Sequence, residues 1–104
     1  MAAGAVGINC QKLTEAAAFA AAGFDDILIT YNILGAQKLA GLRALQDRVA
    51  RLSVVADSAV TVAGLAAAFD AAKPLTVLVE CDSGGGRCGV QSPDEALALA
   101  VKIP

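Results

Sequence analysis

Four short runs of apolar residues recur along the chain, and each run is nearly continuous rather than alternating with polar residues. The runs cover residues 5–9, 26–31, 53–57 and 75–81. Continuous apolar runs of this length are typical of strands that are covered on both faces, as in parallel sheets. The pattern therefore predicts four parallel β-strands.

A helical segment follows each of these runs. The predicted helices cover residues 13–22, 36–52 and 60–72, and a fourth begins after residue 92. The second helix has leucines at helical spacing along one face and charged residues on the other. The fourth opens with Ser92-Pro93-Asp94-Glu95, in which Ser92 is the N-cap and Glu95 completes a capping box.

The alternation of strands and helices predicts an α/β fold of four βα units with a parallel sheet, in a single domain over residues 1–104. Two architectures fit this order: a small open sheet, or half of a TIM-type barrel of eight units. In both, the chemistry is carried at the carboxyl ends of the strands. Polar side chains gather at those positions: Asn9, Cys10, Gln11, Lys12, Thr30, Tyr31, Asn32, Asp57, Ser58, Glu80, Cys81, Asp82 and Arg87.

The composition excludes several classes of protein. Of the 104 residues, 57% are hydrophobic and 17% are charged, and the formal net charge is −2. These values exclude an intrinsically disordered chain, and the lack of a basic cluster argues against a nucleic-acid partner. No apolar run reaches the ~18 residues of a membrane-spanning helix, and the first residues do not resemble a signal peptide. We therefore expect a cytoplasmic protein with no nucleic-acid or membrane partner.

The chain has three cysteines and no histidine. An odd number of cysteines cannot close as a disulfide framework, so we expect free thiols in a reducing compartment. Cys10, Cys81 and Cys88 lack the C-x-x-C spacing of a metal site and have no histidine to assist them. We expect all three to be buried as small apolar residues.

The most unusual stretch is Cys-Asp-Ser-Gly-Gly-Gly-Arg-Cys-Gly-Val, at residues 81–90. Its consecutive glycines allow the backbone to approach a ligand closely. We interpret it as a loop that directs Arg87 at an anionic ligand, because the guanidinium donor fork matches oxyanions. A flexible loop is one alternative. A dinucleotide site is another, since the stretch matches G-x-G-x-x-G, but it follows the last strand and no acidic residue is found ~20 positions further on.

Four other side chains at strand ends are candidates for chemistry. Asp57 and Glu80 could form a carboxylate pair for acid–base work, or could each accept hydrogen bonds at a strand end. Lys12 could bind a carbonyl cofactor as an imine, but a solvated lysine is the simpler interpretation. Tyr31 could lie over a flat ligand or fill a layer of a barrel.

Several stretches together resemble the D-threonine aldolase / D-serine dehydratase family, whose pyridoxal-phosphate barrel is shared with alanine racemase. The similar stretches are residues 3–8, 11–16, 23–29, 55–58 and 79–90, and the last is the most specific. The resemblance covers nearly the whole chain. It implies a partial alanine-racemase-like domain that corresponds to about barrel strands two to five.

The resemblance implies a pyridoxal-phosphate-dependent lyase that breaks a carbon–carbon or carbon–oxygen bond of a D-amino acid. Arg87 matches the family arginine that hydrogen-bonds the phenolic oxygen of the cofactor, and it is the one cofactor-binding residue that carries over. The family lysine that holds the cofactor lies in a His-x-Lys-Thr-His-Lys type of motif, which is absent here and whose place would lie upstream of Met1. The family's later phosphate-binding strands and its metal-binding C-terminal domain are absent too. We therefore expect a fragment or truncated relative with no catalytic or metal-binding residue, which binds no cofactor and is inactive on its own.

Half a barrel raises a physical problem, because helices on one side leave the inner sheet face and two strand edges uncovered. The apolar residues expected on that face are Ile8, Leu28, Val54 or Val55, Val77 and Val79. Such a patch would exceed the ~600 Å² found on ordinary monomers. We therefore expect a homo-oligomer, namely a dimer of half-barrels.

Three alternatives remain open. The fold could close instead as a flavodoxin-like sheet with helices on both faces. The function could be that of a self-associating module without chemistry. It could also be that of a small anion-binding protein that uses the loop from Gly84 to Arg87.

Overall fold

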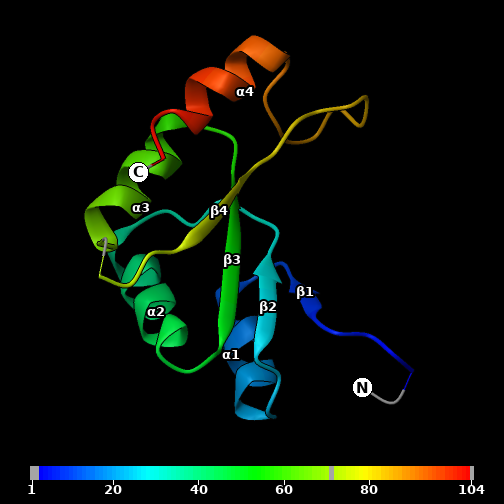
Figure 1. Ribbon diagram of the computed structural model, residues 1–104, viewed down its shortest axis with the longest axis vertical. Coiled ribbons are helices and arrows are strands. Elements are labelled where there is room, and N and C mark those ends of the chain that lie inside the picture. Colours follow the sequence, from blue (N-terminus) through cyan, green and yellow to red (C-terminus); the bar gives the residue numbers. More distant parts are fainter. Residues whose placement is uncertain (1–2, 71, 104) are drawn as a thin grey trace.

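Strands and helices alternate throughout the computed structural model, which describes residues 3–70 and 72–103. The strands are β1 (Ile8–Cys10), β2 (Asp26–Ile29), β3 (Arg51–Ala56) and β4 (Thr76–Val79). The helices are α1 (Leu13–Ala21), α2 (Ala36–Gln46), α3 (Ala59–Ala68) and α4 (Pro93–Ala100). The four predicted βα units are confirmed (Figure 1).

The four strands form one parallel sheet in the order β1-β2-β3-β4, so neighbours in the sequence are neighbours in the sheet. In the register, Ile27 lies beside Ile8 and Leu52, and Val54 lies beside Ile29 and Val77. All four helices lie on one side of the sheet (Figure 1). The flavodoxin-like alternative, which needs helices on both faces, is therefore wrong.

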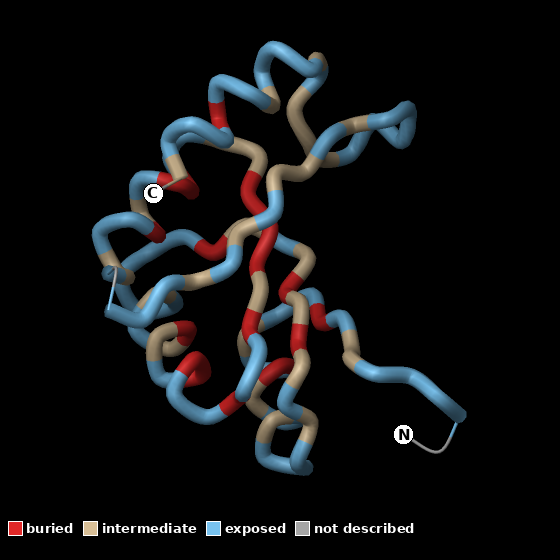
Figure 2. The backbone as a smooth tube through the Cα atoms, viewed as in Figure 1, coloured by how far each residue is buried: buried red, intermediate tan, exposed pale blue. Residues whose placement is uncertain are grey.

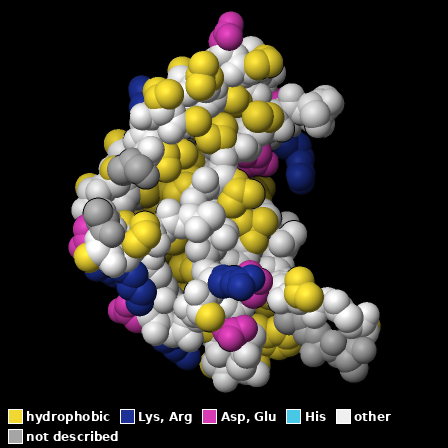
Figure 3. All heavy atoms as spheres, in the orientation of Figure 1, with side chains coloured by type: hydrophobic (Ala, Val, Ile, Leu, Met, Phe, Trp, Pro, Cys, Tyr) yellow, Lys and Arg dark blue, Asp and Glu magenta, His cyan; other side chains and the backbone are white. Residues whose placement is uncertain are grey.

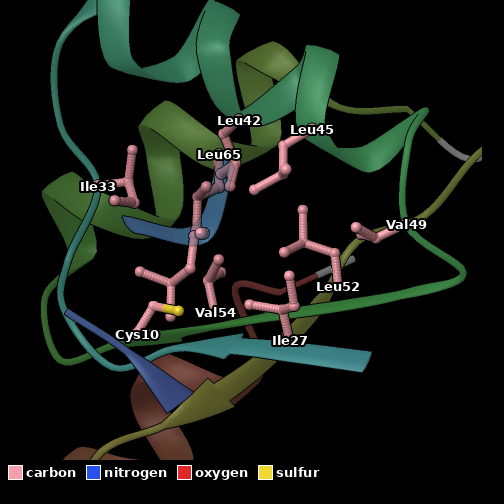
Figure 4. Packing of buried hydrophobic residues seen from close by; sticks show 11 residues of the cluster. Cys10, Ile27, Ile33, Leu42, Leu45, Val49, Leu52, Val54 and Leu65 are labelled. Atoms are coloured by element: carbon pink, nitrogen blue, oxygen red, sulfur yellow. The ribbon is translucent and has the colours of Figure 1, made fainter. Parts of the chain in front are cut away.

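The main hydrophobic core lies between the sheet and helices α1, α2 and α3. Ile27, Ile29 and Val54 from the strands and Leu42 from α2 are at most 1% exposed, and Figure 4 shows Ile27, Val54 and Leu42 pointing into the same space. A smaller cluster joins Ala56 of β3 to α3 and α4. Figure 2 shows the buried residues running along the strands and along the inner sides of the helices.

The open face of the sheet is more polar than the sequence suggested. Of the residues expected there, Leu28 and Val55, one of the two alternatives at that position, do lie on the open face. Ile8, Val77 and Val79 instead pack in the clusters on the helix side. Because side chains alternate along a strand, the opposite face carries the residues between them. Those residues are Asn9, Leu28, Ser53, Val55, Thr76 and Leu78. The expectation of a continuous apolar face is therefore wrong, and a mixed polar and apolar face takes its place.

The second helix is shorter than predicted. Leucine spacing suggested a helix over residues 36–52, but α2 ends at Gln46 and Arg51 already belongs to β3. The backbone N–H of Arg51 donates to the carbonyl oxygen of Asp25, so sheet pairing takes over where the helical pattern would continue. The Gln46 side chain secures this end of α2 by donating to the carbonyl oxygens of Lys73 and Pro74.

The other boundaries also shift by a few residues. Strand β1 covers Ile8–Cys10 rather than residues 5–9. Helix α3 ends at Ala68 rather than near residue 72, because Phe69 is already extended and Asp70 accepts hydrogen bonds from the N–H groups of Ala72 and Lys73. Residue 71, inside the predicted helix, lies outside the described residues. The predicted Ser92 cap of α4 is present, with its hydroxyl accepting from the N–H of Glu95.

Within the described part of the chain, no helix is both long enough and apolar enough to cross a membrane. The longest of them, α2, has 11 residues.

The core predicts a large difference between two leucines that stand on helices. Leu42 is 0% exposed and Leu97 is 65% exposed. Leu42→Ala should lower the free energy of unfolding by about 2–5 kcal/mol, because it leaves a cavity in the main core. Leu97→Ala should change it by less than about 0.5 kcal/mol. Urea denaturation followed by circular dichroism measures both, and equal effects would contradict the packing described above.

Candidate functional site at the carboxyl ends of the strands

The chemistry-bearing side chains gather where the parallel strands end. Asn32 follows β2, Asp57 follows β3, and Glu80 opens the segment that follows β4. The loop of residues 81–91 projects beyond β4 on the side away from α2 and α3 (Figure 1). The polar side chains predicted at the strand ends thus share one edge of the sheet.

One carboxylate organises the glycine-rich loop. Oδ1 of Asp82 accepts hydrogen bonds from the backbone N–H groups of Gly84 (2.9 Å) and Gly86 (3.1 Å). Oδ2 accepts from Nε2 of Gln91 at 3.1 Å. The glycines are needed here, since Gly84 and Gly86 have φ values of +130° and +71°. The loop is therefore built around Asp82.

The same contacts lower the pKa of Asp82 below its ordinary value of 3.8. The N–H of Gly84 contributes most, followed by the N–H of Gly86 and the Gln91 amide. Because the folded-state pKa is depressed, the stabilisation from these bonds is present above the unfolded pKa and is lost as the pH falls through the folded pKa. At neutral pH the carboxylate is charged and both of its oxygens accept hydrogen bonds.

These hydrogen bonds also bear on the anion-binding interpretation of the loop. A cradle of backbone N–H groups could hold an anion, but Asp82 already occupies those of Gly84 and Gly86. Arg87 is exposed and forms no ion pair with any residue in the described ranges. The guanidinium of Arg87 is therefore the group that the loop offers to an anion.

A second carboxylate connects the loop to the sheet. Oδ2 of Asp57 accepts from the backbone N–H of Gly89 at 2.9 Å, and the backbone N–H of Asp57 donates to Oδ1 of Asn32 at 3.1 Å. A backbone bridge between Cys81 and Val90 closes the base of the loop. The ends of β2 and β3 and both ends of the loop are thus linked in one network.

Asp57 and Glu80 come together, as one of the two interpretations of these residues predicted, and Cys88 joins them. One ligand atom from each of the three lies within 4.8 Å of the others. Oε2 of Glu80 is buried and has no hydrogen-bond partner among the described residues. These groups have the chemistry to share a proton or to bind a cation. The position of Cys88 was not predicted, because it depends on how the glycine loop folds back.

The cysteines are free, as expected, but they are not all buried. Cys10 is buried, Cys81 is exposed and Cys88 is half-buried. Burial raises the pKa of the Cys10 thiol, and the neighbouring Glu15 carboxylate raises it further. The expectation of three buried thiols is correct only for Cys10, since Cys81 and Cys88 flank a loop rather than a core strand.

Lys12 and Tyr31 lie at the same edge of the sheet, and both are exposed. The hydrogen bonds that organise the loop do not include either side chain. Lys12 is the N-cap residue of α1, two residues after the end of β1. Among the described residues, neither the Lys12 nor the Tyr31 side chain thus forms a hydrogen bond with the loop network.

Comparison with known proteins agrees with this geometry. The family model described as "Alanine racemase, N-terminal domain" matches residues 1–104. The chain belongs to this family. Its fold of four βα units is half of the TIM-like barrel of the alanine racemase N-terminal domain.

The relatives found for this alanine racemase N-terminal domain chain include aldolases. D-threonine aldolase of an Arthrobacter species is 47% identical over 102 residues, which are 97% of this chain and 26% of the relative. 3-Hydroxy-D-aspartate aldolase of Paracoccus denitrificans is 37% identical over 98 residues, 93% of this chain and 25% of the relative. The crystal structure of D-threonine aldolase from Filomicrobium marinum matches with a TM-score of 0.90 and 39% identity, covering 98% of this chain and 28% of that one. The chain spans about a quarter of the length of these relatives.

The geometry of the loop predicts that replacing two of its glycines by alanine changes the free energy of unfolding to very different extents. A Cβ atom on Gly89, which has a φ of +112°, would lie 2.5 Å from the backbone N of Asp82 and 2.6 Å from the carbonyl carbon of Cys81. Gly85 has open space around it. Gly89→Ala should lower the free energy of unfolding by about 1–3 kcal/mol or more, whereas Gly85→Ala should change it by less than about 0.5 kcal/mol. Urea denaturation of the two variants checks this, and a harmless Gly89→Ala would show that the loop is not closed at Cys81.

Proposed function

We propose that residues 1–104 form half of the pyridoxal-phosphate barrel of a D-amino-acid lyase, in which Arg87 binds the phenolic oxygen of the cofactor. The reaction would break a carbon–carbon bond of a β-hydroxy-D-amino acid, or a carbon–oxygen bond as in the dehydratases that the family includes. The names of the related aldolases support the substrate class. The observation that carries the proposal is the exposed and unpaired state of Arg87 within the described part of the chain.

The chemistry of Arg87 fits this role. A guanidinium donates two parallel hydrogen bonds and stays charged at any working pH, so it favours an ionised phenolic oxygen. Pyridoxal phosphate, when bound, serves as an electron sink for the bond that breaks. The network around Asp82 and Asp57 fixes the backbone on both sides of Arg87. This chain would thus offer an exposed guanidinium, on a hydrogen-bonded loop backbone, to the phenolic oxygen of the cofactor.

We propose further that these 104 residues catalyse no lyase reaction by themselves. The cofactor-carrying lysine motif of the family is absent from them, and Lys12 is an exposed lysine that takes no part in the loop network. Asp57 and Glu80 lie where a proton could be moved, but they need a cofactor held covalently beside them. The activity therefore requires a lysine from outside this segment.

Protection of Arg87 by the cofactor tests the first proposal. Without the family lysine this chain is expected to hold no cofactor covalently, so the test uses pyridoxal phosphate in large excess and detects weak non-covalent binding. Phenylglyoxal should modify Arg87 more slowly under these conditions, because the anion occupies the guanidinium. Arg48 is the matched control, since it is also exposed and forms no ion pair with a described residue, but it lies in the turn before β3. Mass spectrometry of the digested protein measures both sites. Equal protection of Arg87 and Arg48, or none, would contradict the assignment of Arg87.

The same incubation examines the second proposal. Borohydride reduction followed by peptide mapping detects any imine between the cofactor and a lysine. The expected result is no specific labelling of Lys12 and no release of aldehyde from D-threonine. A reducible imine at Lys12 together with turnover would show that these residues suffice for catalysis.

We propose in addition that a second copy covers the open side of the sheet, with β4 of one copy beside β1 of the other. Both are edge strands whose outer backbone groups have no strand partner among the described residues, and edges of this kind pair readily. All strands run parallel in sequence order, so repeating the order once would give eight strands around a two-fold axis. Because the open face is mixed rather than apolar, edge pairing supports this proposal more than apolar area does.

A charge on the open face tests this association. Leu78 lies on that face and is 44% exposed, whereas Leu97 lies on α4 and is 65% exposed. The unmodified chain should have the mass of a dimer in multi-angle light scattering at micromolar concentration. Leu78→Lys should shift it to a monomer, and Leu97→Lys should not. A stable monomer of the unmodified chain would end the proposal.

A further inference from the structure

We infer that Asp82 is a positioning residue, whose carboxylate fixes the glycine loop so that Arg87 presents its guanidinium to a ligand rather than to the protein. The inference rests on the role proposed above for Arg87 and extends it to a residue that touches no ligand. It also identifies the chemical group that matters, namely the two oxygen acceptors of Asp82.

The hydrogen bonds of Asp82 span the loop from its start to its end. Asp82 holds the start and the middle of the loop through the N–H groups of Gly84 and Gly86. Nε2 of Gln91 connects Oδ2 of Asp82 with the carbonyl oxygen of Gly89 at the end of the loop, at 3.1 and 3.2 Å. Hydrogen bonds therefore fix the backbone on both sides of Arg87. The Arg87 side chain itself is bound by neither Asp82 nor Gln91 in the described part of the chain.

Asp82 and Arg87 form no ion pair in the described part of the chain. Asp82 is five positions from Arg87, and in a loop rich in glycine these opposite charges could easily meet. Instead, both oxygens of Asp82 are used by the N–H groups of the loop and by the Gln91 amide. The other acidic groups next to the loop, Asp57 and Glu80, lie with Cys88 and form no ion pair with Arg87 in the described part of the chain. The hydrogen bonds of the loop thus keep its own carboxylate from neutralising its arginine.

The apolar groove between α3 and β4 carries no comparable argument. It encloses about 250 Å³ and is lined by Leu65, Phe69, Val77 and Ile103 among others. Figure 3 shows apolar side chains spread over this face and over α4. Nothing in the structure identifies what would cover the groove, so the loop is the stronger site for inference.

The experiment compares Asp82→Ala with Asp82→Asn, and uses Asp25→Ala as a matched control. Asp25 is exposed just before β2, at the opposite edge of the sheet. The chain is labelled with ¹⁵N-glycine, which gives signals from its 10 glycines. Signals from Gly23, Gly35 and Gly41 show whether each variant is folded, and those of Gly84 and Gly86 report on the loop.

Asp82→Ala should shift the Gly84 and Gly86 signals and should raise the concentration of pyridoxal phosphate that half-protects Arg87 by about tenfold, the change expected when a charged hydrogen bond is lost. Asp82→Asn keeps one oxygen acceptor for the two N–H groups, so it should remain within about threefold of the unmodified protein. Asp25→Ala should change neither measurement. Rescue by asparagine separates positioning from a general loss of stability.

Each outcome decides one of the two claims. If pyridoxal phosphate does not protect Arg87 in the unmodified protein, the proposed function fails, and the inference is then judged on the glycine signals alone. Unchanged Gly84 and Gly86 signals in Asp82→Ala would overturn the inference. Unchanged protection in that variant, where the unmodified protein is protected, would overturn it too, as would an Asp82→Asn variant that behaves like Asp82→Ala.

Discussion

The parallel register of the four strands decides which side chains this protein can bury. Ile27, Leu52 and their in-register neighbour Ile8 all point toward the helices, so one face of the sheet closes over a continuous core. The same register places the residues between them on the face that no helix covers. It also brings the carboxyl ends of the strands to one edge, where Asp57 and Glu80 accept hydrogen bonds from the loop and Asn32 accepts from the N–H of Asp57. Core, open face and candidate site therefore all follow from one set of backbone hydrogen bonds.

The carboxylates near this edge have different partners and hence different roles. Asp82 is used entirely within the loop, Asp57 joins the loop to β3, and Glu80 retains a buried oxygen without a partner among the described residues. None of them pairs with Arg87 in the described part of the chain. An exposed guanidinium without an ion-pair partner among the described residues is free to donate to the phenolic oxygen of a pyridine cofactor. The loop geometry and the family membership therefore support the same proposal from independent directions.

Much of the fold could be predicted from the sequence, because continuous apolar runs and helix caps are local signals. The cap at Ser92 is one example. The end of α2 could not be predicted in this way, since the leucine spacing continues past Gln46 and only pairing with β2 reveals where the strand begins. The site was predictable only in part. Arg87, Asp57 and Glu80 stand at strand ends in the sequence, but the approach of Cys88 and the use of Asp82 depend on hydrogen bonds across the loop.

The strand order has a consequence for how such a chain forms. Each strand pairs only with the strands before and after it in the sequence, so every new sheet contact closes a loop of roughly one helix and its connections. The entropy lost in each closure is small, and contacts between near neighbours in the sequence favour rapid folding. A polypeptide of this design can add one βα unit after another during its synthesis on the ribosome, with β4 as the growing edge.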